Sequence, residues 1–191
     1  MLAALLDLVL PRSCTGCEAP GLGLCASCRA VLAARPLGLV RPSPCPAGLP
    51  EVAALSSYAG EVQRLLLAHK EKGQLGLTKP LGRALAAAVR VHGLDPVEPV
   101  VLCPVPSSRA AVRQRGHDHA MRLARAASRT LGLEARRLLV PARTVADQAG
   151  LTTRQRADNV AGALRATGVP ALPVVVVDDV MTTGATLVEA A

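Results

Sequence analysis

The residues with the most evident chemistry lie near the C-terminus, directly after four consecutive valines. Asp178 and Asp179 follow Val174–Val177, and the small, hydroxyl-rich run Thr182, Thr183, Gly184, Ala185 and Thr186 comes next. Two adjacent carboxylates suit neighbouring hydroxyls or a hydrated divalent cation. A glycine-containing turn that opens a helix offers unpaired N–H groups and the positive end of the helix dipole to a phosphate monoester. Together these residues predict a ribose phosphate ligand.

These side chains need a sheet and helices to position them. The four valines predict a buried strand, whose carboxyl end is where an open parallel sheet binds its ligands. We expect Thr78 to cap the second predicted helix, Asp118 to cap the third, and Gly132 to end the third. Strands are also expected at 100–105 and 138–140, and helices at 61–70, 80–91 and 118–131. Strands that alternate with helices predict an α/β fold with a parallel sheet.

The run from Val174 to Thr186 resembles the phosphoribosyl pyrophosphate (PRPP) motif of type I phosphoribosyltransferases. That motif has four hydrophobic residues, two acids, one hydrophobic residue and a Thr-Thr-Gly-x-Thr loop, and every one of these positions matches. The resemblance implies a type I phosphoribosyltransferase-like sheet flanked by helices. It also implies PRPP as the ligand, bound together with Mg²⁺.

Four cysteines near the N-terminus form the second chemical signal. Cys14, Cys17, Cys25 and Cys28 have the pattern C-x2-C-x7-C-x2-C, and four thiolates in such pairs can close a tetrahedral Zn²⁺ site. We therefore expect a structural zinc rather than disulfides. Cys45 lies in a Pro-rich stretch. It is either part of a linker or a fifth thiol that could replace one of the four zinc ligands. Cys103, inside an apolar run, is expected to be a buried free thiol.

The chain is expected to be cytoplasmic, with a small N-terminal module and one main domain. Residues 1–12 carry an apolar stripe at helical spacing, but Asp7 and the lack of a basic start argue against a signal peptide. No segment is long and apolar enough to predict a membrane span. We expect the zinc module and its Pro-rich linker over residues 1–48 and the phosphoribosyltransferase-like domain over residues 49–191.

Charge and aromatic content narrow the class of ligand. Residues 109–165 contain 12 Arg, four acidic residues and no Lys, so this stretch alone accounts for the formal net charge of +8. Arg offers a planar fork that matches phosphate oxygens, so the stretch favours a pyrophosphate or a nucleic-acid backbone. Tyr58 is the only aromatic residue of the Phe, Trp and Tyr types, which weakens a role that depends on stacking of nucleobases.

Taken together, three stretches behind a four-cysteine module resemble the ComF family of competence-associated phosphoribosyltransferase-like proteins. They are residues 104–124, residues 143–164 and the PRPP motif. The resemblance implies a pyrophosphate loop at 104–109 that involves Ser107, Arg109 and Arg115. It also implies a hood loop at 143–159, from which Arg156 reaches the pyrophosphate. Gln148 and Asn159 belong to the same stretch, with simple loop capping as an equal alternative.

The implied activity is transfer of a phosphoribosyl group from PRPP to an unknown acceptor, with Asp178, Asp179 and Arg156 as the catalytic residues. The alternative is a PRPP-sensing or DNA-uptake accessory protein that binds nucleic acid without turnover. Whether the protein forms a homo-dimer is left open, and no membrane partner is expected.

Two departures from the family pattern bear on this interpretation. His117, Asp118 and His119 replace the usual aromatic-Asn-Gln, and we expect them to be exposed residues at a helix start rather than metal ligands. The chain also ends five residues after Thr186, whereas a type I fold continues with a further strand, so we expect the C-terminal part of that fold to be missing.

Overall fold

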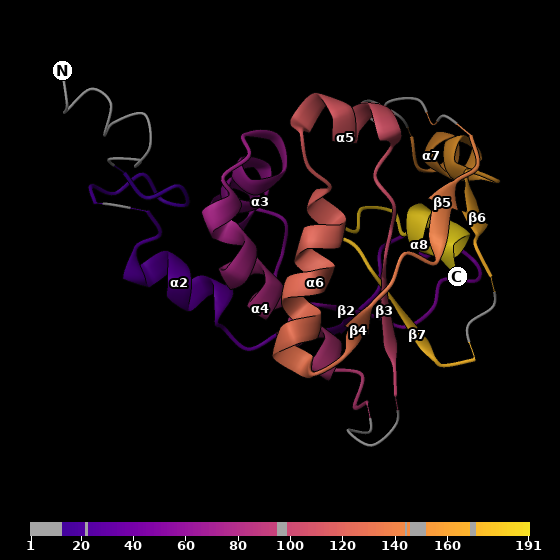
Figure 1. Cartoon of the computed structure of the whole chain (residues 1–191), viewed down its shortest axis with the longest axis horizontal. Coiled ribbons are helices and arrows are strands. Elements are labelled where there is room, and N and C mark those ends of the chain that lie inside the picture. Colours follow the sequence, from indigo (N-terminus) through magenta and orange to yellow (C-terminus); the bar gives the residue numbers. More distant parts are fainter. Residues whose placement is uncertain (1–12, 22, 95–98, 144, 146–151, 169–170) are drawn as a thin grey trace.

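The fold is described from a computed structural model of the chain. The description covers residues 13–21, 23–94, 99–143, 145, 152–168 and 171–191. The apolar stripe expected near the start, and Gln148, lie outside these residues. Figure 1 shows the helices and strands along the chain.

A three-stranded parallel sheet lies at the centre, in the order β4-β3-β7. Its middle strand, β3 (Val101–Pro104), is buried at every position and pairs with β7 (Val174–Val177) from Val101↔Val174 to Pro104↔Val177. The short β4 (Glu134–Ala135) pairs along the other edge of β3. The predicted α/β fold with a parallel sheet is confirmed. The prediction that all four valines are buried is wrong, because β7 is an edge strand in which Val177 is buried while Val174 is exposed.

Two long helices cover one face of this sheet. Helices α4 (Thr78–Arg90) and α6 (His119–Leu131) pack along each other and form a buried cluster with the sheet. That cluster contains Ala86, Val89, Leu102, Ala124, Ala127 and Val177. Asp118 caps α6 by accepting from the backbone N–H of Met121, and Gly132 ends the helix in the left-handed conformation, both as predicted. Without Phe or Trp, this interface is filled by small and branched aliphatic side chains.

The start of α4 differs from the prediction. The helix begins at Thr78 itself, one residue after the short 3-10 helix η1 (Leu75–Leu77), so Thr78 is not its cap. The Thr78 hydroxyl instead lies 3.0 Å from Nε2 of His69. His69 belongs to α3 (Gly60–Glu71), which confirms the helix expected at 61–70.

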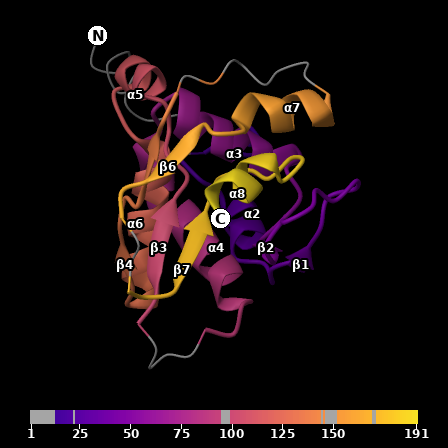
Figure 2. The same cartoon turned by 90° about the vertical axis from the view of Figure 1, so that its right-hand side faces the viewer.

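Two antiparallel pairs of strands lie outside the central sheet. Strand β5 (Leu139–Pro141) pairs with β6 (Leu164–Ala166), and β1 (Gly38–Val40) pairs with β2 (Val52–Ala54). The strand expected at 138–140 therefore exists, but it belongs to an antiparallel pair and not to the parallel sheet. Three shorter helices follow β3, β5 and β7 in the chain, and Figure 2 shows α7 next to α8. They are α5 (Arg109–Arg115), α7 (Thr153–Val160) and α8 (Ala185–Ala190).

The cysteine-containing segment packs directly on the main body. Helix α2 (Ala26–Leu32) begins at the cap residue Cys25. Cys14, Cys28 and Leu32 share one buried cluster with Leu65 of α3 and with Leu81 of α4. The segment therefore adds its cysteines to a core that α3 and α4 also build. None of the helices in the described part of the chain combines the length and the hydropathy that a membrane span needs.

Candidate functional site

The four predicted cysteine ligands meet in one cluster. The Sγ atoms of Cys14, Cys17, Cys25 and Cys28 all lie within 4.8 Å of one another. The Cys17 and Cys25 sulfurs are 3.6 Å apart. A disulfide would need about 2.05 Å, whereas thiolates about 2.3 Å from a tetrahedral zinc stand about 3.8 Å apart. The donor set and the spacing fit a structural zinc ion.

Backbone amides prepare this cluster for a metal. The N–H groups of Cys25 and Cys28 donate to the sulfurs of Cys14 and Cys25, both at 3.4 Å. Burial alone would raise the pKa of Cys14, but hydrogen bonds from backbone amides, first that of Cys25, lower it to about 6. Burial and the neighbouring sulfurs raise the pKa of Cys28. Metal-free, the cluster therefore holds its negative charge unevenly, and a cation would relieve the crowding of thiolates.

The acidic pair lies at the carboxyl end of β7, as predicted. Asp178 and Asp179 are locked to each other, because the Asp179 N–H donates to Oδ1 of Asp178 at 2.8 Å. Lys70 of α3 donates to Oδ2 of Asp179 at 2.9 Å. Nε2 of His119, at the start of α6, lies 3.4 Å from the same oxygen. The pair is thus held between a sheet strand and two helices.

The pKa values of the two carboxyl groups are shifted in opposite directions. Burial, with the nearby charge of Asp179 as the next cause, raises the pKa of Asp178 well above its usual range. Burial also acts on Asp179, but the hydrogen bond from His119 and the ammonium group of Lys70 outweigh it, so the pKa of Asp179 lies below its usual range. A negative charge on this pair is therefore more stable on Asp179 than on Asp178.

A cavity of about 390 Å³ opens beside the acidic pair, and we call it the polar cavity. Six of the residues predicted to bind PRPP line it together, and they come from two stretches that are far apart in the sequence. They are Ser107, Arg115, Asp178, Asp179, Thr182 and Thr186. Lys70, His119, Arg143 and Glu189 line it as well. Cations and hydroxyls thus surround the carboxylates, an arrangement that suits a ligand with both phosphate and hydroxyl groups.

Arg115 connects the predicted pyrophosphate loop to the acidic pair. Its Nε lies 3.0 Å from a carboxylate oxygen of Glu71, and its Nη1 lies 3.0 Å from Nδ1 of His119. Ser107 Oγ is 3.3 Å from the same Nδ1. Arg109 is exposed at the first position of α5 and does not line the polar cavity.

The hydroxyl-rich loop turns into α8 as expected. Gly184 caps that helix in the left-handed conformation at φ 81°, and the Ala185 N–H lies 3.5 Å from the Thr183 hydroxyl. A Cβ on residue 184 would lie 2.9 Å from Cδ1 of Leu49. The Pro-rich segment thus packs against this loop. Thr183, Gly184 and Ala185 form the turn, while Thr182 and Thr186 line the cavity.

The stretch predicted as a hood loop contains a helix. Helix α7 begins with a capping box in which Thr152 and Gln155 bond each other's backbone N–H groups. Arg156 lies on α7, does not line the polar cavity, and has a buried Nε without a hydrogen-bond partner in the described part of the chain. Arg143 does line the cavity and donates to the carbonyl oxygens of Asn159 and Ala161 at 3.0 and 3.2 Å.

The prediction that His117 and His119 are exposed is wrong. Both side chains are buried. The His117 ring lies 3.0 Å from the Arg115 carbonyl oxygen and 3.2 Å from the His69 carbonyl oxygen, and His119 faces Asp179. Lys70 and His119 are the site residues that sequence reasoning missed. Lys70 belongs to no motif, and the only signal for His119 was its departure from the family pattern.

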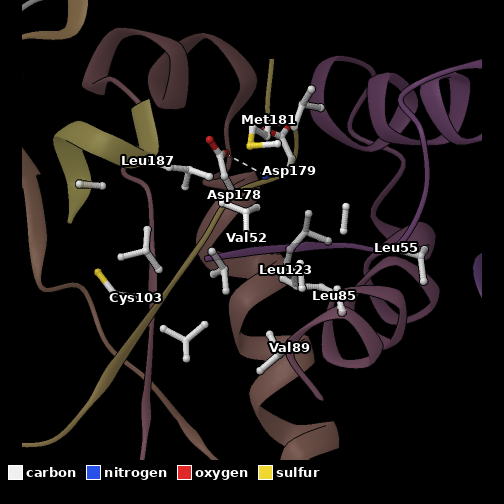
Figure 3. A pocket seen from close by; sticks show the side chains of 18 of the residues that line it. Val52, Leu55, Leu85, Val89, Cys103, Leu123, Asp178, Asp179, Met181 and Leu187 are labelled. Carbon is white, nitrogen blue, oxygen red and sulfur yellow. Dashed lines mark hydrogen bonds between the residues drawn. The ribbon is translucent and has the colours of Figure 1, made fainter. Parts of the chain in front are cut away.

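A larger cavity of about 750 Å³ meets the acidic pair from the other side (Figure 3). Aliphatic side chains from β2, α4, α6 and α8 dominate its wall, among them Val52, Leu85, Leu123 and Leu187. Cys103, the predicted buried thiol, also lines it. Asp178 and Asp179 therefore stand between a polar and an apolar cavity.

Comparisons with protein-family models, curated proteins and solved structures find no match to this chain. The fold and the two sites define an α/β protein with a parallel three-stranded sheet, a four-cysteine cluster and a polar cavity built around an acidic pair.

Proposed function

We propose that this protein is a ComF-like member of the type I phosphoribosyltransferases, which binds PRPP and transfers its phosphoribosyl group to an acceptor. The observation that carries the proposal is the polar cavity. Residues from the 104–109 turn, from α5 and from the Val174–Thr186 run line it, although the pyrophosphate loop and the PRPP motif were predicted from separate parts of the sequence. The parallel order of β3 and β7, with both carboxyl ends at this cavity, supports the same proposal.

Each part of PRPP has suitable groups in the cavity. The ionised Asp179 accepts hydrogen bonds from ribose hydroxyls, and Asp178, whose pKa burial raises, can both donate and accept in its protonated form. The turn at Thr182–Thr186 takes the 5-phosphate. Arg115, Arg143 and Ser107 face the pyrophosphate, and Arg forks match its oxygens.

In the proposed reaction a nucleophile attacks C1 of the ribose while the bond from C1 to the pyrophosphate oxygen breaks. Positive charge develops on the ribose ring, and negative charge develops on the leaving pyrophosphate. Arg115 and Arg143 stabilise the leaving charge, and Asp179 lies on the side of the ribose hydroxyls. No side chain is assigned as general base, since pyrophosphate is a good leaving group and positioning supplies much of the rate.

Carboxylate oxygens of Asp178 and Asp179 are the groups that would hold Mg²⁺, directly or through water. The metal would neutralise charge on the pyrophosphate when bound. The ionised Asp179 fits this role, and its partner Lys70 limits how much further positive charge the pair can accept.

The decisive experiment is a calorimetric titration with PRPP and Mg²⁺. The wild type is expected to bind, and Asp179→Asn is expected to weaken binding by at least about 10-fold through loss of a charged acceptor. Arg109→Gln is the matched control, since Arg109 lies outside the polar cavity. A wild type that does not bind PRPP would refute the proposal. Binding without release of pyrophosphate, over a panel of acceptors, would favour the alternative role as a PRPP sensor.

A further inference from the structure

Lys70 is the one site cation that comes from α3, a helix without any predicted ligand-binding motif. Its Nζ lies 2.9 Å from Oδ2 of Asp179, across 109 positions of the sequence. Its side chain is 30% exposed while that of Asp179 is 6% exposed, so the ammonium group lies at the mouth of the site and the carboxylate lies inside.

The backbone around Lys70 is held from several directions. His69, the preceding residue, is buried, and its carbonyl oxygen lies 3.2 Å from Nε2 of His117. Glu71, the following residue, forms an ion pair with Arg115. One turn earlier Leu65 is fully buried beside the cysteine cluster. Lys70 therefore extends from a fixed platform, and its long side chain loses less freedom on contact with Asp179 than a side chain on a loop would.

Both partners of Asp179 use the same carboxylate oxygen. Arg115 can only donate, so the close approach of its Nη1 makes Nδ1 of His119 an acceptor and leaves the proton of the neutral ring on Nε2. Nε2 lies 3.4 Å from Oδ2, where the Lys70 ammonium group also lies. Two donors on Oδ2 fix the plane of the carboxylate. Oδ1 remains the oxygen that can receive a ligand hydroxyl.

We propose that Lys70 is a positioning residue for sugar recognition: it holds Oδ2 of Asp179 so that Oδ1 accepts a hydrogen bond from one ribose hydroxyl. This inference rests on the proposed function and deepens it, because it assigns the choice of a ribose over a deoxyribose ligand to a residue outside the PRPP motif. Lys70 acts through Asp179 and makes no contact with the reacting carbon.

The test compares three sugar phosphates as competitors of PRPP: ribose 5-phosphate, 2-deoxyribose 5-phosphate and 3-deoxyribose 5-phosphate. The wild type is expected to prefer ribose 5-phosphate over at least one deoxy analogue by about 10-fold, the usual size of a lost hydrogen bond to a charged group. In Lys70→Met that preference is expected to fall below about threefold, because Asp179 is no longer held in one plane. Lys70→Arg restores a donor and is expected to recover the preference.

Lys72→Met is the matched control, since Lys72 is exposed at the end of the same helix. It is expected to keep the wild-type preference. Lys70→Gln repeats the comparison with a polar side chain in case the Met variant is unstable, and thermal unfolding checks both. A purely structural role of Lys70 would weaken all three sugar phosphates equally.

The outcomes separate this inference from the proposed function. Failure of the wild type to bind PRPP overturns the proposed function. If the wild type binds PRPP, two results overturn the role of Lys70 alone: no discrimination by the wild type between the three sugars, or the same discrimination in Lys70→Met as in the wild type.

Discussion

Gly82 of α4 lies directly against Ala126 of α6. A Cβ on residue 82 would lie 2.3 Å from Cβ of Ala126 and 3.1 Å from its carbonyl carbon, so no side chain fits between the two helices at this point. The close approach brings α4 and α6 together over one face of the sheet, and α6 carries His119 at its first position.

Gly82→Ala should therefore destabilise the protein. The added methyl group forces the helices apart, and such overpacking costs about 1–3 kcal/mol, which opposes the gain of about 1 kcal/mol from the better helix propensity of Ala. We expect a lower midpoint of urea unfolding. Gly76→Ala is the control, because a Cβ there meets nothing within 4 Å. Equal stability of Gly82→Ala and the wild type would show that α4 can shift freely along α6.

Removal of zinc should lower the stability of more than the N-terminal segment. Cys14 and Cys28 share a buried cluster with Leu65 and Leu81, so loss of the metal exposes apolar surface of α3 and α4. We expect about one zinc per chain by elemental analysis, and a lower melting temperature after treatment with a strong chelator. Cys17→Ser should reproduce the effect, whereas Cys45→Ser, at an exposed position, should not. Full zinc content in Cys17→Ser would contradict the ligand assignment.

The free energy of unfolding should fall as the pH is lowered, because His69 resists protonation in the folded protein. Burial is the largest cause that lowers the pKa of His69 from 6.5 to about 4. The unfolded chain therefore binds a proton that the folded protein excludes, and stability is lost as the pH falls from about 6.5 towards 4. The difference corresponds to about 3 kcal/mol.

Urea unfolding across this pH range measures the effect, and His69→Gln should flatten the curve. His92→Gln is the control on a half-buried histidine. An unchanged slope in His69→Gln would assign the acid sensitivity to other groups.

Gly184→Ala should destabilise the fold and distort the turn at Thr182–Thr186. Residue 184 adopts φ 81°, and an added Cβ would lie 2.9 Å from Leu49. The backbone term costs about 1–2 kcal/mol, and PRPP affinity should fall because the turn between Thr182 and Thr186 must shift. Leu49→Ala in the same chain should recover the part due to the clash. Gly168→Ala, with nothing within 4 Å, is the control, and wild-type affinity in Gly184→Ala would show that the loop tolerates a side chain.

Long apolar runs and helix caps allowed much of the fold to be predicted. The run of β3 is buried at every position, the apolar run of β7 pairs beside it, and Asp118 and Gly132 mark the two ends of α6. The two- and three-residue strands β4, β1 and β6 have too few positions to show a period, and pairing alone defines them. Helix α7 could have been found, because Thr152 and Gln155 have capping-box spacing.

The residues of the candidate site also differ in whether the sequence alone could predict them. Asp178, Asp179 and Thr182 occur in one contiguous run, so their spacing alone predicted a common ligand. Lys70 reaches Asp179 only after α3 docks on the sheet, and nothing in its local sequence marks that contact. The burial of His119 depends on where α6 begins relative to β7, which helix caps do not determine.

The packing of α3 limits which fragments of this protein keep their supporting contacts. Its middle contacts the cysteine segment, because Arg64 bonds the Gly16 carbonyl oxygen and Leu65 shares a buried cluster with Cys14 and Cys28. Its last turn supplies Lys70 to the acidic pair. A fragment that begins at residue 50 would lose the partners of Leu65 and also Leu49, which covers the Gly184 turn. A fragment that contains the sheet but not the cysteine segment would therefore keep the polar cavity without two of its supporting contacts.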